Sequence, residues 1–248
     1  MVYALFSGWG SIAEVRECSG GAVKGIIMAQ AVSVRDAIPA MPGASDAYTT
    51  AREELYRAEE ALRKQIGTVA AQRRTLPAGP EVQDYAFIEG ERRVRLSELF
   101  SRGSELIVYH LMYWADDDEF CPMCSLWIDG LNGVAKHVEQ RANIVVATRA
   151  PVEKLQAWAK RRGWDSIRLL SDDGPTFACD TGAEDPNGDP VETVLVFSKD
   201  GPAIRNTYVS HALMFGQFGG IDLLSPVWHL FDLLPSGRDD WSASNDYA

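Results

Sequence analysis

The hydrophobic and polar positions of the chain change their spacing near residue 80. Over residues 45–74, apolar side chains recur every three or four positions, and glutamate and arginine fill the positions between them. This stripe consists of Leu55, Ala58, Leu62, Ile66 and Val69. A capping box over residues 50–53 and the proline-rich residues 76–80 mark the two ends of a predicted helix. The stripe either packs on its own domain or serves as a dimer arm, because an amphipathic helix needs a surface to cover its apolar face.

After residue 80, short apolar runs alternate with helical patterns. Runs typical of strands cover residues 85–87, 94–96, 106–113, 143–148 and 167–170. Helical patterns cover residues 96–100, 125–140 and 152–162, and the last of these ends at Gly163. The strands at 106–113 and 143–148 flank a helix, so we expect them to pair in parallel. A polar loop over 171–190, a hairpin formed by 193–197 and 204–209, and a helical segment near 222–232 complete the pattern.

These patterns divide the chain into four segments. Residues 1–43 are rich in glycine, alanine and serine without a firm period, and we expect a flexible N-terminal arm. Residues 44–80 form a helical extension, residues 81–241 form an α/β domain, and residues 242–248 form a polar tail.

Composition and charge exclude several classes of partner. The net charge of -11 argues against nucleic acid and against anionic membranes, which both attract basic surfaces. No apolar run approaches the roughly 20 residues of a membrane-spanning helix. Four cysteines are too few for a secreted disulfide scaffold of 248 residues, and the first nine residues lack the basic start of a signal peptide. We therefore expect a cytoplasmic protein.

The sequence Cys121-Pro122-Met123-Cys124 lies between a predicted strand and a predicted helix. Two intervening residues on a first helical turn bring the sulfurs close enough to form a disulfide. Free N–H groups and the positive end of the helix dipole favour Cys121 as a thiolate. Cys121 is thus the candidate nucleophile and Cys124 the resolving cysteine, while Pro122 removes one N–H and stiffens the turn.

Two other interpretations of the cysteine pair stay open. It can be a structural thiol pair, or it can be half of a zinc site completed by Cys179, His137 or His211. The zinc interpretation lacks a second C-x-x-C and an H-x-x-x-H motif, so we expect neither a metal nor an organic cofactor. We otherwise expect Cys179 to be a small core residue.

An acidic run directly before Cys121, residues 116–119, opposes the thiolate. The helix dipole contributes roughly 0.3–1 kcal/mol at exposed sites. Each exposed carboxylate costs about a few tenths of a kcal/mol after screening. Because these contributions nearly cancel, we expect the pKa of Cys121 to stay near the ordinary value of about 8.5. The pair would then be a weak or reducing thiol site rather than a strong oxidant.

Five other side chains are candidates for supporting roles. His110 lies inside an apolar strand and is either a core histidine or a group that moves protons during thiol exchange. Tyr109, Trp114 and Trp127 are expected to pack around the helix that begins at the cysteine pair. Arg149 follows a parallel strand, on the side where such sheets bind ligands, or it forms a loop salt bridge.

The chain resembles a thioredoxin-like family of bacterial proteins with a domain of unknown function, which are predicted dithiol-disulfide oxidoreductases related to the peroxiredoxin superfamily. The resemblance covers residues 49–241. The stretches that carry it are Arg73–Pro77, Asp84–Phe87, Leu106–Met112, Cys121–Ser125, Arg149–Pro151, Gly163–Trp164, Asn206–Tyr208 and Leu234–Asp239. It implies a thioredoxin-like fold, with a central mixed sheet flanked by helices and an N-terminal helical extension.

The chain departs from related families at three positions. Phe120 stands where thioredoxins have a tryptophan, and Glu192 or Thr193 stands where they have a cis-proline. Peroxiredoxins carry a threonine three residues before the first cysteine, and Asp118 stands there instead.

The resemblance implies a thiol-disulfide oxidoreductase whose substrate is a disulfide or thiol of a protein or a small molecule. The alternative is a non-catalytic thioredoxin-fold protein for binding or assembly, in which the cysteine pair is structural or binds metal. A homodimer formed through residues 45–74 fits either function.

Overall fold

The computed structural model describes residues 33–114, 117–172, 174, 176–211 and 225–246. The chain forms two compact units, Met1–Ala71 and Gln72–Ala248. Most of the expected N-terminal arm, residues 1–32, lies outside the described part of the chain.

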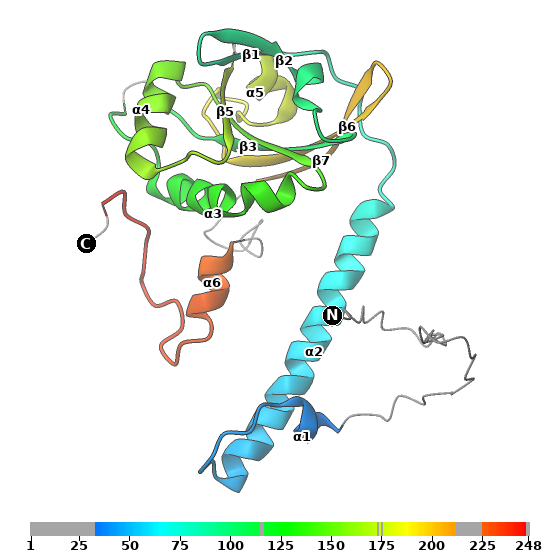
Figure 1. Ribbon diagram of the computed structural model, residues 1–248, viewed down its shortest axis with the longest axis vertical. Coiled ribbons are helices and arrows are strands. Elements are labelled where there is room, and N and C mark those ends of the chain that lie inside the picture. Colours follow the sequence, from blue (N-terminus) through cyan, green and yellow to red (C-terminus); the bar gives the residue numbers. More distant parts are fainter. Residues whose placement is uncertain (1–32, 115–116, 173, 175, 212–224, 247–248) are drawn as a thin grey trace, which may run out of the picture. The chain divides into compact units, whose positions relative to one another are not determined.

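The first unit contains α1 (Val34–Ala37) and most of α2 (Asp46–Arg74) (Figure 1). The capping box predicted at residues 50–53 is wrong, because α2 begins one turn earlier. The Tyr48 backbone N–H donates to the Ser45 hydroxyl at 3.1 Å, whereas the Thr50 hydroxyl donates to the Asp46 carbonyl inside the helix. None of the residues of α2 is buried by the part of the chain that the structure describes.

The second unit is built on one mixed sheet of seven strands, in the order β2-β1-β5-β4-β3-β6-β7. The central strands β3, β4 and β5 are parallel, as expected, and all other pairs are antiparallel. The strands are β1 (Ala86–Glu89), β2 (Arg92–Arg95), β3 (Glu105–Leu111), β4 (Asn143–Thr148), β5 (Arg168–Asp172), β6 (Thr193–Asp200) and β7 (Ala203–His211).

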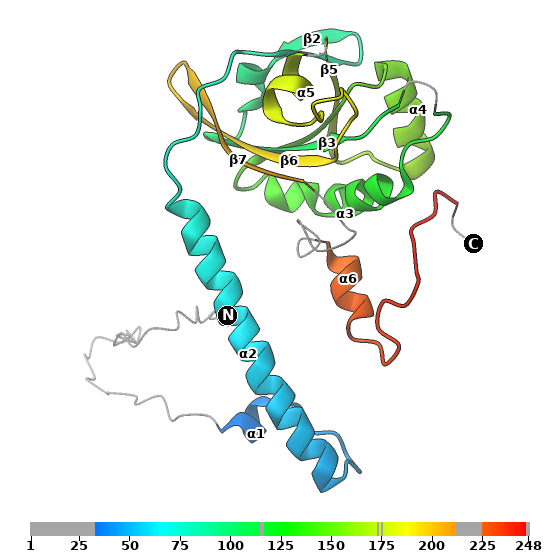
Figure 2. The same ribbon diagram turned by 180° about the vertical axis from the view of Figure 1, so that it is seen from behind.

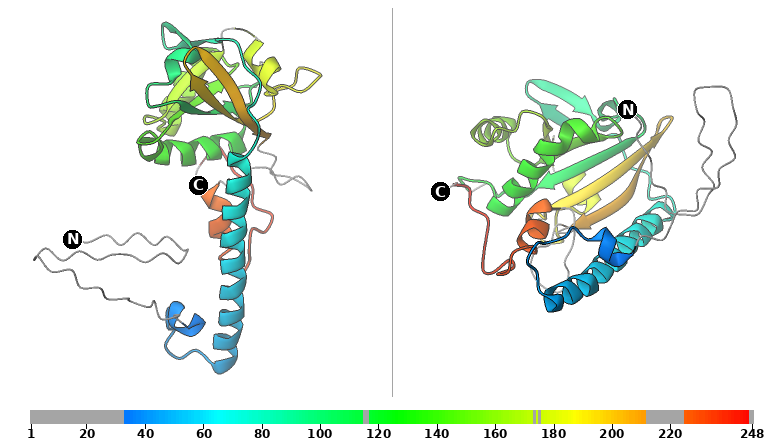
Figure 3. Two further views of the ribbon diagram at one scale, coloured as in Figure 1. Left: turned by 90° about the vertical axis from the view of Figure 1, so that its right-hand side faces the viewer. Right: turned by 60° about the horizontal axis from the view of Figure 1, so that its bottom comes forward.

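Helices cover both faces of this sheet. The helices of the second unit are the 3-10 helix η1 (Leu96–Leu99), α3 (Pro122–Val138), α4 (Val152–Arg162), α5 (Thr176–Thr181) and α6 (Pro226–Phe231). Helix α3 packs on one face and α5 on the opposite face (Figures 2 and 3). Helix α4 ends at Gly163, as predicted, and this glycine adopts a left-handed conformation with φ 73°.

Alternation along β3 separates two hydrophobic cores. Tyr109 and Leu111 face α3 and α4, where they pack with Trp127. Leu106 and Val108 face the other way and pack with Phe177 of α5. The sequence pattern had indicated a polar loop at the position of α5, and this prediction was wrong.

The strand–helix–strand unit followed by a hairpin and a final helix makes this a thioredoxin-like fold, with an N-terminal helix in addition. Within the described ranges, no helix is long and apolar enough to cross a membrane.

Candidate dithiol site

The cysteine pair stands at the start of α3, as the sequence predicts. Cys121 occupies the N-cap position and Pro122 the first helical turn. The Ser125 backbone N–H donates to the Cys121 carbonyl at 2.9 Å, which closes that turn. Cys121 is half-buried, Cys124 is fully buried, and both are free thiols. The two cysteines are therefore one helical turn apart, and Cys121 is the more accessible of them.

Hydrogen bonds at the helix start stabilise a thiolate on Cys121. The Cys124 thiol makes the largest contribution, and the backbone N–H groups of Cys124 and Met123 add to it. Burial and the carboxylate of Glu192 oppose them, and together these influences lower the pKa of Cys121 to about 6. The expected pKa near the ordinary value was therefore too high.

Cys124 shows the opposite shift. Its interaction with the Cys121 sulfur and its burial raise the pKa of Cys124 well above its ordinary value. The two shifts belong to one coupled pair, in which the first proton leaves Cys121 and the second stays on Cys124. This is the charge distribution that a nucleophile and a resolving thiol require.

Two aromatic side chains, Tyr109 and Trp127, pack in the same core cluster as Cys124. Tyr109 is fully buried on the face of β3 that turns towards α3, and its ring stacks on Trp127 with centroids 6.1 Å apart. Its hydroxyl makes no conventional hydrogen bond to any described residue, but burial and the neighbouring Cys124 raise the pKa of Tyr109 well above its usual value. Trp114, the third aromatic residue predicted here, is 40% exposed.

Glu192 is a member of the site that the sequence pattern indicated only as a departure from thioredoxins. It directly precedes β6, the neighbour of β3, and is 9% exposed. Burial raises the pKa of Glu192, and its carboxylate raises the pKa of both cysteines. No cis peptide bond occurs in the described part of the chain.

Two basic side chains of α4 bond to the acidic run before Cys121. Arg161 donates to Glu119 at 2.6 Å, and Lys154 donates to the Asp117 carbonyl. Hydrogen bonds from Arg161 and from Asn245 lower the pKa of Glu119. Arg161 thus partly neutralises Glu119, the member of the run nearest to Cys121 in the sequence, and Asp116 lies outside the described residues.

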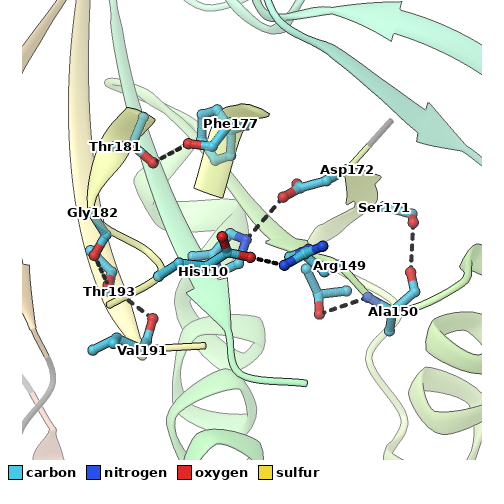
Figure 4. A network of polar contacts seen from close by, with 12 residues as sticks. His110, Arg149, Ala150, Ser171, Asp172, Phe177, Thr181, Gly182, Val191 and Thr193 are labelled. Carbon is cyan, nitrogen blue, oxygen red and sulfur yellow. Dashed lines mark hydrogen bonds and ion pairs between the residues drawn. The ribbon is translucent and has the colours of Figure 1, made fainter. Parts of the chain in front are cut away.

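His110 and Arg149 lie close together (Figure 4), and the His110 ring lies beside Phe177 of α5, on the face of the sheet opposite α3. His110 Nε2 lies 3.1 Å from Asp172 Oδ2, and both side chains are almost completely buried. Arg149 forms an ion pair with Glu184. His110 therefore lies buried in the core, and Arg149 takes part in a salt bridge.

The three additional ligands considered for zinc are dispersed. Cys179 is exposed on α5, so its predicted place in the core was wrong. His137 lies in the last turn of α3, at the far end of the helix from Cys121, and His211 ends β7. The described residues contain no group of three His, Cys, Asp or Glu side chains that could hold a metal ion.

Comparisons with solved structures find peroxiredoxins and thioredoxins. The peroxidoxin BcpB of Mycobacterium tuberculosis is 24% identical, with 53% of this chain and 86% of that chain covered and a TM-score of 0.42. The exposed lipoprotein thioredoxin Etrx1 of Streptococcus pneumoniae is 13% identical, with coverages of 58% and 99% and a TM-score of 0.40. A 2-Cys peroxiredoxin of Plasmodium vivax is 14% identical, with coverages of 60% and 91% and a TM-score of 0.43.

No curated protein matches the sequence. A family model does match, over residues 40–247, and its description is a bacterial protein of unknown function, DUF899. This match includes the cysteine pair, the whole sheet and Asn245 of the tail. The chain belongs to the DUF899 family.

Proposed function

We propose that the protein is a thiol-disulfide oxidoreductase that uses Cys121 as nucleophile and Cys124 as resolving thiol. One observation carries this proposal: the pKa of the half-buried Cys121 at the start of α3 is lowered, while that of the buried Cys124 one turn later is raised. A structural thiol pair does not require opposite pKa shifts of its two cysteines. Structural buried cysteines are inert, whereas reactive ones are partly exposed in a setting that favours the thiolate.

The reaction transfers two electrons from the dithiol to a substrate disulfide. The Cys121 thiolate attacks one substrate sulfur, the substrate S–S bond breaks, and a mixed disulfide forms as the first substrate thiolate leaves and takes a proton from solvent. Cys124 then loses its proton and attacks the Cys121 sulfur. The Cys121–Cys124 disulfide forms and the second substrate thiolate leaves. A dithiol reductant returns the pair to its starting state, and the same steps in reverse oxidise a substrate dithiol.

The substrate is a disulfide or thiol of a protein or a small molecule, and the proposed compartment is the cytoplasm. The low cysteine content of the chain supports a reducing compartment. The pKa of about 6 is above that of a strong oxidant, about 3.5, and near that of thioredoxin, about 7. We therefore expect the pair to act in the reducing direction.

Single substitutions of the two cysteines test this function. Cys121→Ser should abolish disulfide reduction, measured with a disulfide substrate and dithiothreitol as electron donor. Without dithiothreitol, Cys124→Ser should instead accumulate a mixed disulfide between Cys121 and the substrate, visible by mass spectrometry, because the resolving thiol is missing. Cys179→Ser, which removes an exposed cysteine outside the site, should leave turnover unchanged. Equal activity of Cys121→Ser and the wild type would favour the non-catalytic binding or assembly protein.

The partner of α2 in this proposal is a second copy of the chain. Large apolar side chains on α2 are 45–57% exposed: Tyr48, Leu55, Leu62 and Ile66. Three of them recur at every seventh position, and Ala51 and Ala58 lie between them at the intermediate heptad positions. Such a stripe is complementary to itself, because large side chains of one helix fit beside the alanines of an identical helix. A homodimer through α2 would cover it.

A further inference from the structure

Residues 245 and 246 are attached next to the segment that leads into the cysteine pair. Here Asn245 is 9% exposed and donates through its side-chain Nδ2 to the Phe120 carbonyl at 2.9 Å and to the Glu119 carboxylate at 3.0 Å. These partners precede it by 125 and 126 residues. Figure 1 shows the C-terminal segment, in red, returning from α6 towards α3 and α4.

Two arginines at the end of α4 complete the attachment. Arg162 donates to the Asn245 carbonyl at 3.0 Å. Arg161 divides its two terminal nitrogens between Glu119 at 2.6 Å and Asp246 at 2.7 Å. The tail, the end of α4 and the segment before α3 are therefore joined in one polar network.

This network holds the peptide group that leads into the nucleophile. The Phe120 carbonyl and the Cys121 N–H belong to the same planar peptide unit. A hydrogen bond to the Phe120 oxygen therefore restricts the orientation of Cys121 at the N-cap of α3, where its sulfur must meet the backbone N–H groups of Met123 and Cys124. Phe120 itself is buried and packs against Trp158, with ring centroids 5.6 Å apart.

The same network bonds the carboxylate of Glu119, the acidic residue nearest to Cys121 in the sequence. Both oxygens of Glu119 are bonded, one to Arg161 and the other to Asn245. A carboxylate that accepts from two donors, one of them a guanidinium, is fixed in orientation and partly neutralised. Loss of Asn245 would free one of its oxygens.

The side-chain amide of Asn245 is only partly satisfied by hydrogen bonds, which indicates that the two bonds it donates matter. Its side-chain Oδ1 is buried and has no hydrogen-bond partner among the described residues. Burial of an unpaired polar atom costs stability, so an apolar side chain would fill the same space at lower cost. The two hydrogen bonds that Nδ2 donates, to the Phe120 carbonyl and to the Glu119 carboxylate, therefore account for an asparagine at this position.

We propose that the C-terminal tail is a positioning element of the dithiol site, in which Asn245 holds the Phe120–Cys121 peptide group and the carboxylate of Glu119. The reactive role of Cys121 that it serves is the proposed function, on which this inference rests. Asn245 is a positioning residue, because it acts on Cys121 through the backbone and through Glu119.

The test is the pH dependence of Cys121 alkylation by iodoacetamide, measured in the full chain with Cys18 and Cys179 replaced by serine. The wild-type midpoint should lie near 6. Asn245→Leu keeps the approximate size of the side chain and removes both donated bonds without adding a charge, and Asn245→Ala removes the side chain. Each should raise the midpoint by about half a unit, the size of a helix-end electrostatic effect, which means roughly threefold less thiolate below the midpoint. Ser242→Ala, at an exposed tail position, is the matched control and should change nothing.

A chain that ends at Trp241 provides a second variant, and it should show the same rise. An unchanged or lowered midpoint in all three variants, with an unchanged circular dichroism spectrum, would overturn the proposal. Alkylation requires no turnover, so this result is independent of the oxidoreductase assay. A protein without turnover whose midpoint still moves would refute the proposed function and keep the role of the tail.

Discussion

The reactivity of Cys121 depends on a few charges that meet at one sulfur. Hydrogen bonds from Cys124 and from the helix start favour its thiolate, and Glu192 opposes it. The cysteine contribution is local and was predictable, because the C-x-x-C spacing and the following helical pattern are contiguous in the sequence. The contribution of Glu192 was not predictable, because Glu192 lies near the site only as a result of the pairing of β6 with β3.

Removal of the opposing charge should make Cys121 more acidic. Glu192→Gln keeps the size of the side chain and deletes the carboxylate that raises the pKa of Cys121. We expect the midpoint of Cys121 alkylation to fall by about half a unit from its value near 6. Glu91→Gln, at the exposed β1–β2 turn, is the control. A midpoint that rises in Glu192→Gln would show that Glu192 supports the thiolate.

At the scale of elements, the sequence predicted the strands and the two helices that position the site, but not α5. The flanks of α5 are rich in glycine, proline and aspartate, which are typical of loops. Its formation depends on tertiary packing instead: Phe177 contacts the rings of Tyr85 and Phe87 at 5.1 and 5.0 Å. The helix thus covers a face of the sheet that would otherwise be open to water.

Truncation of Phe177 should therefore destabilise the domain without changing the thiols. We expect Phe177→Ala to lower the free energy of unfolding by about 3–5 kcal/mol, the usual cost of removing a buried phenylalanine. Denaturant unfolding measures this change. Cys179→Ser, two positions along the same helix but exposed, should change it by less than about 0.5 kcal/mol. Equal stabilities of the two variants would mean that α5 is not part of the core.

At the scale of the whole molecule, the chain combines a thioredoxin-like domain with a long helix whose apolar side chains are not buried by any described residue. The amphipathic period of that helix was readable because it repeats within one segment. The attachment of Asn245 beside Phe120 was not readable, because it joins residues 125 positions apart and involves a tail with an ordinary polar composition.

The oligomeric state tests the partner proposed for α2. We expect the wild type to sediment as a dimer, and the double variant Leu55→Glu, Leu62→Glu to sediment as a monomer, because like charges would then meet across the stripe. Lys64→Glu, which changes a charge on an exposed position off the stripe, should remain dimeric. A wild type that is monomeric at all concentrations would contradict a dimer through α2.

The reduction potential of the Cys121–Cys124 pair tests the central claim most directly. The protein is equilibrated in dithiothreitol and glutathione buffers, and the remaining free thiols are trapped and counted. The account predicts a reversible two-electron transition between roughly -300 and -120 mV, nearer the reducing end, which Cys121→Ser abolishes. If no disulfide forms reversibly between Cys121 and Cys124 in any of these buffers, the pair is not a redox centre and the proposed oxidoreductase function is wrong.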